Sequence, residues 1–432
     1  MTAVLVGFVI LLVLILAGLP IAFAMGLVGF GGVVYILGWH PAMAMVAQIT
    51  YETGMNYGLS VVPLFILMGN FVTRAGLSEQ LYVASNAWLG HRRGGLAMAT
   101  IVACAGFSAI CGSSLATAAT MAKVSMPSMR RFGYAPSLAA GSIAAGGTLG
   151  ILIPPSVILV IYGIITSSDI GALFIAGIIP GMLGVLGYLA AIAAVTAVRP
   201  EMGPRGEATP MRERLRALSG VWGVLMLFVL VIGGIYLGVF TPTEAAGIGA
   251  AGAFFFALFR RALTLRTLIE VLGESAQTTA MIFFVLFGAL LFSNFMNLIG
   301  LPTMLLAWVE TLGASPMLVL VAILAIYLLL GCLLESMSMV LLTVPIFYPL
   351  MQAMGFDLIW FGIVVVVVTE ISLITPPVGL NVFVLKAVLP DTDTATIFRG
   401  VTPFWAADIV RLGLIVFVPW FSLVLPNLMK AG

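Results

Sequence analysis

Between Arg266 and Lys386 the chain carries no lysine or arginine over more than a hundred residues, and apolar side chains dominate that whole interval. Only 8% of all 432 residues are charged, and 62% are hydrophobic. A soluble core of this size would need far more polar surface to face water. Because one spanning helix takes roughly 20 apolar residues, the sequence predicts about ten membrane-embedded segments. The lipid bilayer is therefore the first expected partner of the chain.

The N-terminus, the cysteines and the net charge each argue against a common alternative. The first 38 residues are uncharged and longer than the apolar core of a signal peptide, so we expect a retained first helix and no cleavage. Cys104, Cys111 and Cys332 all lie in apolar runs, which predicts buried thiols rather than disulfides or a metal site. The net charge of +2 is spread over short loops, so no nucleic acid partner is expected.

Four arginine clusters divide the chain into membrane segments. Loops rich in Lys and Arg stay on the cytoplasmic side, so the clusters mark that side. The apolar segment between Arg93 and Arg130 returns to the side that it left. Its centre, Gly112-Ser113-Ser114, predicts a re-entrant hairpin with a non-helical tip, because irregular backbone at membrane depth must face protein or water. The clusters are Arg92-Arg93, Arg130-Arg131, the stretch from Arg199 to Arg216, and Arg260 to Arg266.

Two proline pairs interrupt apolar segments at matching places. Proline removes a backbone donor and clashes with the preceding turn, so Pro154-Pro155 and Pro376-Pro377 each predict a broken helix. The same constant spacing relates Pro127 to Pro349, Met129 to Met351 and Gly133 to Gly355, and it places Ser113 and Ser114 on Glu335 and Ser336. The chain therefore contains an internal repeat.

The cationic residues indicate that the second repeat is inverted. The first hairpin begins and ends at arginines, the second at loops that have none, and Lys386 and Arg399 flank a turn whose first-half equivalent is charge-poor. Inverted repeats with interrupted helices are typical of secondary transporters that bind substrate near the bilayer midplane. The predicted fold class is an all-α polytopic membrane protein, with two re-entrant helical hairpins and two helices broken at Pro-Pro pairs.

These features predict a domain organisation with two repeats and a scaffold. The expected units are an N-terminal scaffold helix and connection (1–56), a first repeat (57–198) with a hairpin near 94–129 and a broken helix at 135–166, a cytoplasmic loop (199–217), linking scaffold helices (218–266), and an inverted second repeat (267–428) with a hairpin near 316–354 and a broken helix at 358–390. Trp88, Trp222, Trp308 and Trp360 fall near predicted span ends, as interfacial anchors do.

Several motifs near the tips and breaks carry a family resemblance. They are Gly112-Ser113-Ser114, Pro127-Ser128-Met129, Gly133-Tyr134, Gly150 to Ser156, and Glu370 to Asn381. In these residues, and essentially end to end, the chain resembles the large membrane subunit (M or DctM type) of the tripartite ATP-independent periplasmic (TRAP) transporters. The resemblance implies an elevator-type ion-transporter fold in the bacterial inner membrane. At Cys111 the chain departs from a serine that is frequent in the family, which would leave ion coordination there to backbone carbonyls.

The resemblance also implies an activity and two protein partners. The activity is sodium-gradient-driven uptake of an organic acid, such as a C4-dicarboxylate, a sialic acid or another sugar acid. The partners are a small four-helix membrane subunit (Q or DctQ type) and a periplasmic solute-binding protein (P or DctP type). No cofactor is expected beyond Na⁺ as the coupling ion, and no transition metal is expected.

Broken helices supply the free carbonyl and hydroxyl oxygens that sodium prefers, and their exposed helix-start amides suit a carboxylate. The alternative for each Ser or Thr is that its hydroxyl bonds back to a helical carbonyl or joins two helices. The predicted sodium ligands are Ser113, Ser114, Gly150, Ile153 and Pro155 in the first half and Glu335, Ser336, Thr369, Ser372 and Thr375 in the second. The predicted substrate contacts are Gly112, Ser156, Pro376, Pro377, Gly379 and Asn381.

Ionisable side chains at membrane depth are functional candidates, because an unpaired one costs at least roughly 2.5 kcal/mol. Glu335 and Glu370 belong to this group, and protonation, pairing or ion contact can each offset the cost. We expect Lys123 to extend its amine toward the nearby loop. For Asn381 a helix cap is the alternative to a substrate contact. Glu244 follows Thr241-Pro242-Thr243 and is predicted to support a helix start rather than transport.

Three other function classes compete with this interpretation. An intramembrane enzyme or a respiratory subunit would need paired His ligands, a His-Asp pair or an Asp dyad at depth, whereas His40 and His91 both fall at predicted segment ends. We therefore expect no enzyme activity. A passive channel fits an inverted repeat with two breaks less well than alternating access does. A stand-alone sodium-coupled carboxylate carrier, which needs no binding protein, is opposed only by the resemblance.

Overall fold

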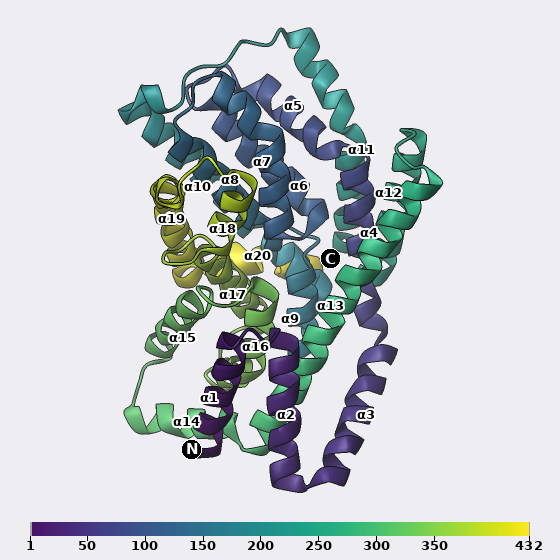
Figure 1. Ribbon diagram of the computed structural model, residues 1–432, viewed down its shortest axis with the longest axis vertical. Coiled ribbons are helices and arrows are strands. Elements are labelled where there is room, and N and C mark those ends of the chain that lie inside the picture. Colours follow the sequence, from purple (N-terminus) through teal and green to yellow (C-terminus); the bar gives the residue numbers. More distant parts are fainter. Residues whose placement is uncertain (1, 432) are drawn as a thin grey trace.

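The computed structural model describes residues 2–431 as a bundle of helices, and this part of the chain contains no β-strand (Figure 1). The first half comprises α1 (Thr2–Leu16), α2 (Ile21–Leu37), α3 (Trp39–Met55), η1 (Tyr57–Ser60), α4 (Val61–Arg74), α5 (Leu77–Leu89), α6 (Gly95–Cys111), α7 (Ser114–Arg131), α8 (Pro136–Thr148), η2 (Leu149–Ile151), α9 (Val157–Thr166), α10 (Ile170–Val198) and η3 (Pro200–Met202). The second half comprises α11 (Met211–Tyr236), α12 (Pro242–Phe259), α13 (Leu265–Leu298), α14 (Leu301–Leu312), α15 (Pro316–Leu330), α16 (Ser336–Ala353), α17 (Leu358–Ser372), α18 (Leu380–Val388), α19 (Thr394–Phe417) and α20 (Trp420–Ala431).

The helix boundaries follow the repeat. Helices α7 and α16 are both 18 residues long and begin at Ser114 and Ser336, which the proline spacing had matched. Helices α8 and α17 begin at positions related by the same offset, and each ends just before a double proline. The correspondence extends back to α2 and α12, since Pro20 precedes α2 and Pro242 begins α12.

The two hairpins approach the centre of the molecule from opposite ends. Figure 1 shows α6 and α7 in the upper half of the view and α15 and α16 in the lower half. Six helices among the described residues are long and apolar enough to cross a bilayer, and α11 raises the number to as many as seven. The shorter apolar helices include α9 and α17, which are halves of the broken helices. The predicted fold class, an all-α inverted repeat with two hairpins and two broken helices, is confirmed.

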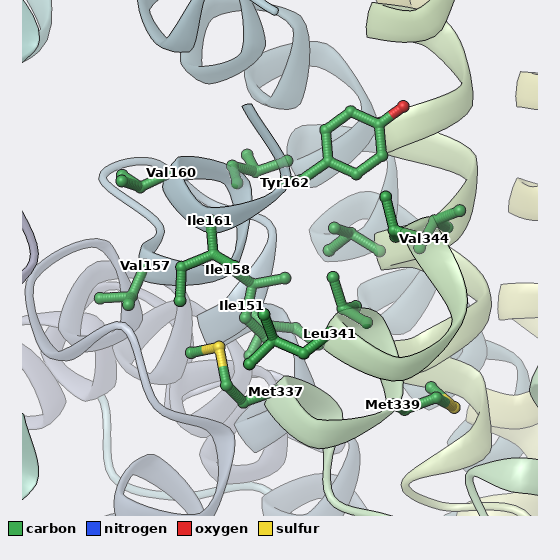
Figure 2. Packing of buried hydrophobic residues seen from close by; sticks show 14 of the residues in the cluster. Ile151, Val157, Ile158, Val160, Ile161, Tyr162, Met337, Met339, Leu341 and Val344 are labelled. Carbon is green, nitrogen blue, oxygen red and sulfur yellow. The ribbon is translucent and has the colours of Figure 1, made fainter. Parts of the chain in front are cut away.

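The repeats interlock across the core. Helix α9, beyond the first break, packs on α16 of the second hairpin, and α18, beyond the second break, packs on α7 of the first hairpin. Figure 2 shows the first of these contacts, where Ile158 and Tyr162 of α9 extend toward α16, on which Leu341 and Val344 lie. All four side chains are buried. Each hairpin is therefore held by the partner repeat as well as by its own.

Small residues let α8 and α19 approach at backbone distance. A Cβ built on Gly141 would lie 2.3 Å from the carbonyl carbon of Gly400, and one on Gly400 would lie 1.9 Å from the carbonyl oxygen of Ser137. Close approach through small residues is the usual way that membrane helices gain packing energy. This contact ties the first broken helix of one repeat to the crossing helix of the other.

One predicted interfacial anchor is wrong. The side chain of Trp360 is only 2% exposed, and its Nε1 donates a hydrogen bond of 2.9 Å to the carbonyl oxygen of Ile415. Its position near a helix start suggested the membrane surface, but α19 covers that turn of α17. By contrast, Trp222 and Trp308 are exposed.

The α8–α19 contact predicts a sharp difference between two glycines of α19. Gly400→Ala forces atoms into the Ser137 carbonyl, and overpacking of this kind typically costs about 1–3 kcal/mol. We expect a lower melting temperature and a lower yield of monodisperse protein in detergent. Gly413→Ala is the matched control, because nothing lies within 4 Å of its built Cβ. Equal behaviour of the two variants would contradict the packing described here.

Candidate functional site

The tip of the first hairpin is a two-residue interruption between α6 and α7. Gly112 adopts a left-handed conformation, with φ at +62°, which a side chain would strain. Ser113 is the N-cap of α7, and its Oγ accepts a hydrogen bond of 3.4 Å from the amide of Ala116. Ser114 follows as the first helical residue and is buried. The predicted non-helical tip is therefore present at Gly112-Ser113.

The first break lies against this tip. A Cβ built on Gly150 would lie 3.4 Å from the carbonyl oxygen of Ser113, and one on Gly112 would lie 3.8 Å from the carbonyl oxygen of Pro155. The Pro154-Pro155 peptide is cis. Four residues predicted as ligands or substrate contacts thus come together as backbone groups of the tip and the break. The side chain of Ile153, in contrast, packs toward α10 at Gly181.

Ser156 closes the first break. Its Oγ donates a 2.5 Å hydrogen bond to the carbonyl oxygen of Ile151 and accepts a hydrogen bond from the amide of Leu159 as the N-cap of α9. The side chain is fully buried. Both hydrogen bonds join the Ser156 hydroxyl to backbone groups nearby in the chain. In this conformation Ser156 therefore has a structural role rather than the predicted role of a substrate contact.

The second hairpin tip uses a carboxylate where the first uses a hydroxyl. Glu335 is the N-cap of α16, and its Oε1 accepts hydrogen bonds from the amide of Ser338 at 3.1 Å and from its Oγ at 3.2 Å. The side chain is only half-buried, and Ser336 behind it is buried. Glu335 therefore occupies the place that the repeat assigned to it, and the capping hydrogen bonds offset part of its desolvation.

The second break gathers three hydroxyls on the last turns of α17. Each donates to a carbonyl oxygen of its own helix: Thr369 to Val365 at 2.7 Å, Ser372 to Thr369 at 2.7 Å, and Thr375 to Ile371 at 2.6 Å. Such hydrogen bonds from a hydroxyl to the preceding turn of its own helix are what the alternative to sodium binding predicts. A hydroxyl that donates its proton still presents its oxygen lone pairs, so the oxygens of Thr369 and Ser372 remain acceptors at the break, whereas the Oγ1 of Thr375, just beyond the end of α17, accepts a hydrogen bond from Trp405.

The tip of the second hairpin also packs against the broken helix of its own repeat. A Cβ built on Gly331, at the end of α15, would lie 1.9 Å from the Oγ of Ser372, so only glycine permits this approach. The Sγ of Cys332 lies 3.9 Å from the carbonyl oxygen of Pro376. Pro376 and Pro377 are exposed, and Gly379 beyond them has φ at +57°. Both repeats therefore build the same arrangement of a tip against a break.

Asn381 joins the two repeats. Its side chain is fully buried, and its Nδ2 donates a 3.1 Å hydrogen bond to the carbonyl oxygen of Ala144 in α8. The N-cap of α18 is Gly379, so the capping role considered for Asn381 is not its role here. Its Oδ1 lacks a hydrogen-bond partner among the described residues.

Two other expectations concern charged residues outside the breaks. Glu244 forms a capping box with Thr241, whose amide donates 2.8 Å to the Glu244 carboxylate while the Thr241 Oγ1 accepts from the Glu244 amide at 3.3 Å. The structural assignment of Glu244 is confirmed. Lys123 is exposed on α7, and the direction of its amine stays a prediction.

Sequence reasoning missed the partners of Glu370. The guanidinium of Arg411 in α19 lies 2.5 Å from the Glu370 carboxylate and 2.9 Å from that of Asp408, one turn away. The phenol of Tyr188 in α10 donates a 2.5 Å hydrogen bond to Asp408. None of these side chains is more than 3% exposed. A signal was available, since two opposite charges at i, i+3 inside an apolar helix are unusual in a membrane segment.

Comparison with known proteins decides the family. Residues 8–421 match the family model described as the DctM component of the tripartite ATP-independent periplasmic transporters. The chain belongs to this family. Within it, the chain is 39% identical over 402 residues to the C4-dicarboxylate TRAP transporter large permease protein DctM of Pseudomonas aeruginosa, covering 92% of this chain and 93% of that protein. The resemblance drawn from the sequence is confirmed.

Other DctM-family relatives carry different substrates in their names. The sialic acid TRAP transporter large permease protein SiaM of Vibrio cholerae is 34% identical over 96% of both chains. The 2,3-diketo-L-gulonate permease YiaN of Escherichia coli is 34% identical over 93% of this chain and 94% of that protein. These relatives are integral membrane permeases, and the chain is a multi-pass protein of the inner membrane.

Solved structures share the fold of this DctM-family chain at low identity. The YdaH transporter of Alcanivorax borkumensis superposes with a TM-score of 0.63 at 14% identity, covering 91% of this chain and 90% of that one. MtrF of Neisseria gonorrhoeae gives 0.56 at 14% identity, covering 89% and 84%. The first is a transporter and the second is described as representing a class of antimetabolite efflux pumps. At this identity the likeness concerns the fold alone.

Two substitutions of Glu335 can distinguish its role as a helix cap from its predicted role as an ion ligand. Glu335→Ser restores the type of cap that Ser113 supplies in the first repeat, so we expect thermal stability to stay within the wild-type range. The predicted sodium ligand is lost, so half-maximal sodium activation of transport should need more sodium. Glu335→Ala loses the cap as well, at about 1 kcal/mol. A Glu335→Ser variant with unchanged sodium response would make Glu335 a cap and nothing more.

Proposed function

We propose that this chain is the transmembrane carrier of a TRAP system that takes up an organic acid on a sodium gradient, from a periplasmic binding protein, together with a small membrane subunit. The relatives support the substrate class, because C4-dicarboxylate, sialic acid and 2,3-diketo-L-gulonate are all organic acids. Which acid this chain carries depends also on the binding protein, a separate chain.

One observation carries the sodium part of the proposal: in both repeats the hairpin tip lies against the break of the same repeat. The Ser113 carbonyl lies beside Gly150 in the first half-site, and Gly331 lies on Ser372 in the second. Sodium needs several hard oxygens in one place. Each half-site offers backbone carbonyls and hydroxyls from two separate segments, so an ion bound there would join tip to break.

The substrate carboxylate has suitable partners beyond the breaks. Helices α9 and α18 both begin there, and a helix start carries a partial positive charge. The exposed Pro376-Pro377 segment lies just before the start of α18, and the buried Oδ1 of Asn381 in its first turn lacks a hydrogen-bond partner among the described residues. We propose that the carboxylate binds at these helix starts while sodium occupies the tips.

The interlocked packing supports an elevator motion. The hairpins and the broken helices pack on one another, because α9 contacts α16 and α18 contacts α7. Together they form one candidate moving body. Helices α2, α4, α12 and α13 pack mainly on one another and form the candidate scaffold, which meets the candidate moving body where α4 contacts α6 and α13 contacts α16. A polar cleft of about 270 Å³ lies between the two groups. Its polar lining includes Glu52, Thr53, Asn56, Asn294, Asn297 and Tyr348.

A fused relative supports the small membrane partner. The isethionate TRAP transporter permease protein DctMQ of Oleidesulfovibrio alaskensis is 33% identical over 94% of this chain, yet the match covers only 63% of that protein. The name DctMQ joins the M and Q components. We propose that the present chain meets its Q-type partner as a separate subunit, on the scaffold surface.

The first test is uptake of labelled organic acids into proteoliposomes that contain this chain and its Q-type partner. With a binding protein outside and an imposed sodium gradient, we expect accumulation that collapses when either sodium or the binding protein is omitted. The control replaces the sodium gradient with an equal potassium gradient. Sodium-driven uptake without any binding protein would favour a stand-alone carrier. Uptake that ignores sodium would overturn the coupling.

A further inference from the structure

The Glu370–Arg411–Asp408 cluster contains more acidic than basic groups. It has two carboxyl groups and one guanidinium, and the phenol of Tyr188 completes it. Glu370 is fully buried, and Asp408 and Arg411 are 1% and 3% exposed. Among the described residues no further ion pair reaches the cluster. One acidic group without a basic partner of its own is therefore buried between α10, α17 and α19.

The cluster is built to keep its arginine in place. A Cβ built on Gly184 of α10 would lie 2.2 Å from the Nη1 of Arg411, so this glycine leaves the slot that the guanidinium fills. Tyr188, one turn further along α10, fixes Asp408 and also lies 3.2 Å from the Oγ1 of Thr148. The Nη2 of Arg411 lies 2.5 Å from the Oε2 of Glu370 and 2.9 Å from the Oδ1 of Asp408. The Oε1 of Glu370 and the Nε and Nη1 of Arg411 lack hydrogen-bond partners among the described residues.

Glu370 adjoins the second half-site in the sequence, while Tyr188 joins the cluster to Thr148 at the end of α8 in the first repeat. Glu370 stands between Thr369 and Ser372, whose hydroxyls end α17. In the repeat, the position that corresponds to Glu370 is Thr148, an uncharged residue at the end of α8. Trp405 of α19 also touches this half-site, because its Nε1 donates a 3.1 Å hydrogen bond to the Oγ1 of Thr375. One helix, α19, thus carries both the charged cluster and a contact to the predicted ligands.

We propose that the buried cluster supplies the countercharge for a cation at the second half-site, and that Asp408 is a positioning residue that raises sodium affinity there without touching the ion. The inference rests on the proposed sodium coupling. Three neutral hydroxyls and backbone carbonyls bind sodium weakly without a nearby negative charge. Asp408 and Glu370 provide that charge through a cluster that Arg411 and Tyr188 hold rigid.

The test measures binding of radioactive sodium to the purified full-length chain, with fluorescence of Trp405 as a second readout. Asp408→Asn removes one charge but keeps an acceptor for the Tyr188 phenol. At an effective dielectric constant of about 20 and a separation of about 10 Å, the lost charge should weaken sodium binding at one site on the order of tenfold. Asp408→Glu, which keeps the charge, should bind sodium nearly as wild type does.

Two controls separate electrostatics from folding. Glu310→Gln removes an exposed carboxylate on α14, and it should leave the sodium isotherm unchanged. Trp405→Phe should abolish the fluorescence change, which assigns that change to Trp405 among the tryptophans of the chain. Melting temperatures identify any variant that fails to fold, and Tyr188→Phe, which keeps every charge, then replaces Asp408→Glu as the structural reference.

The outcomes distinguish the inference from the function on which it rests. No sodium binding by the wild-type chain would remove the sodium coupling itself. Normal sodium binding by wild type and an unchanged isotherm in a folded Asp408→Asn variant would overturn the inference alone. Loss of affinity to the same extent in Tyr188→Phe and Asp408→Asn would reduce the cluster to a packing role and would also overturn it.

Discussion

The structure depends on how the backbone is satisfied at two double prolines. A proline lacks the amide donor that a helix needs, and an unpaired polar group in lipid costs several kcal/mol, so neither break can face the membrane. Each repeat packs its own hairpin tip against its break: Gly112 supplies the left-handed residue at the first tip, and Gly331 permits the close approach at the second. The other repeat then packs its hairpin arm on the helix beyond the break. The inverted repeat, the hairpins and the candidate sites all follow from this one constraint.

Much of this arrangement could be predicted from the sequence because the constraint repeats itself. A constant spacing between the two proline pairs fixed which residues correspond, and it placed Glu335 on Ser113 before any helix was known. The helix starts at Ser114 and Ser336 bear this out. Glycine and serine at the first tip marked the non-helical point because helices tolerate neither a left-handed residue nor a free cap in their interior.

The rest could not be predicted because it depends on contacts between distant helices. Glu370 was recognised as ionisable, but Arg411 lies 41 residues further on and reaches it only after α17 and α19 pack together. Trp360 was expected at the membrane surface for the same reason, since its neighbour Ile415 belongs to α19. Asn381 bonds to α8 of the other repeat. Residue type and local spacing contain no information about such partners.

The central claim is that the hairpins and broken helices of both repeats move as one body against the scaffold. The most direct measurement is transport by cysteine pairs bridged with a short thiol reagent in a cysteine-free background. Asn294 of α13 and Tyr348 of α16 face the cleft between body and scaffold, whereas Ile158 and Leu341 belong to the packed core of the body. The account predicts that bridging positions 294 and 348 abolishes transport, and that bridging 158 and 341 preserves it. Full transport with the first bridge in place would contradict the claim.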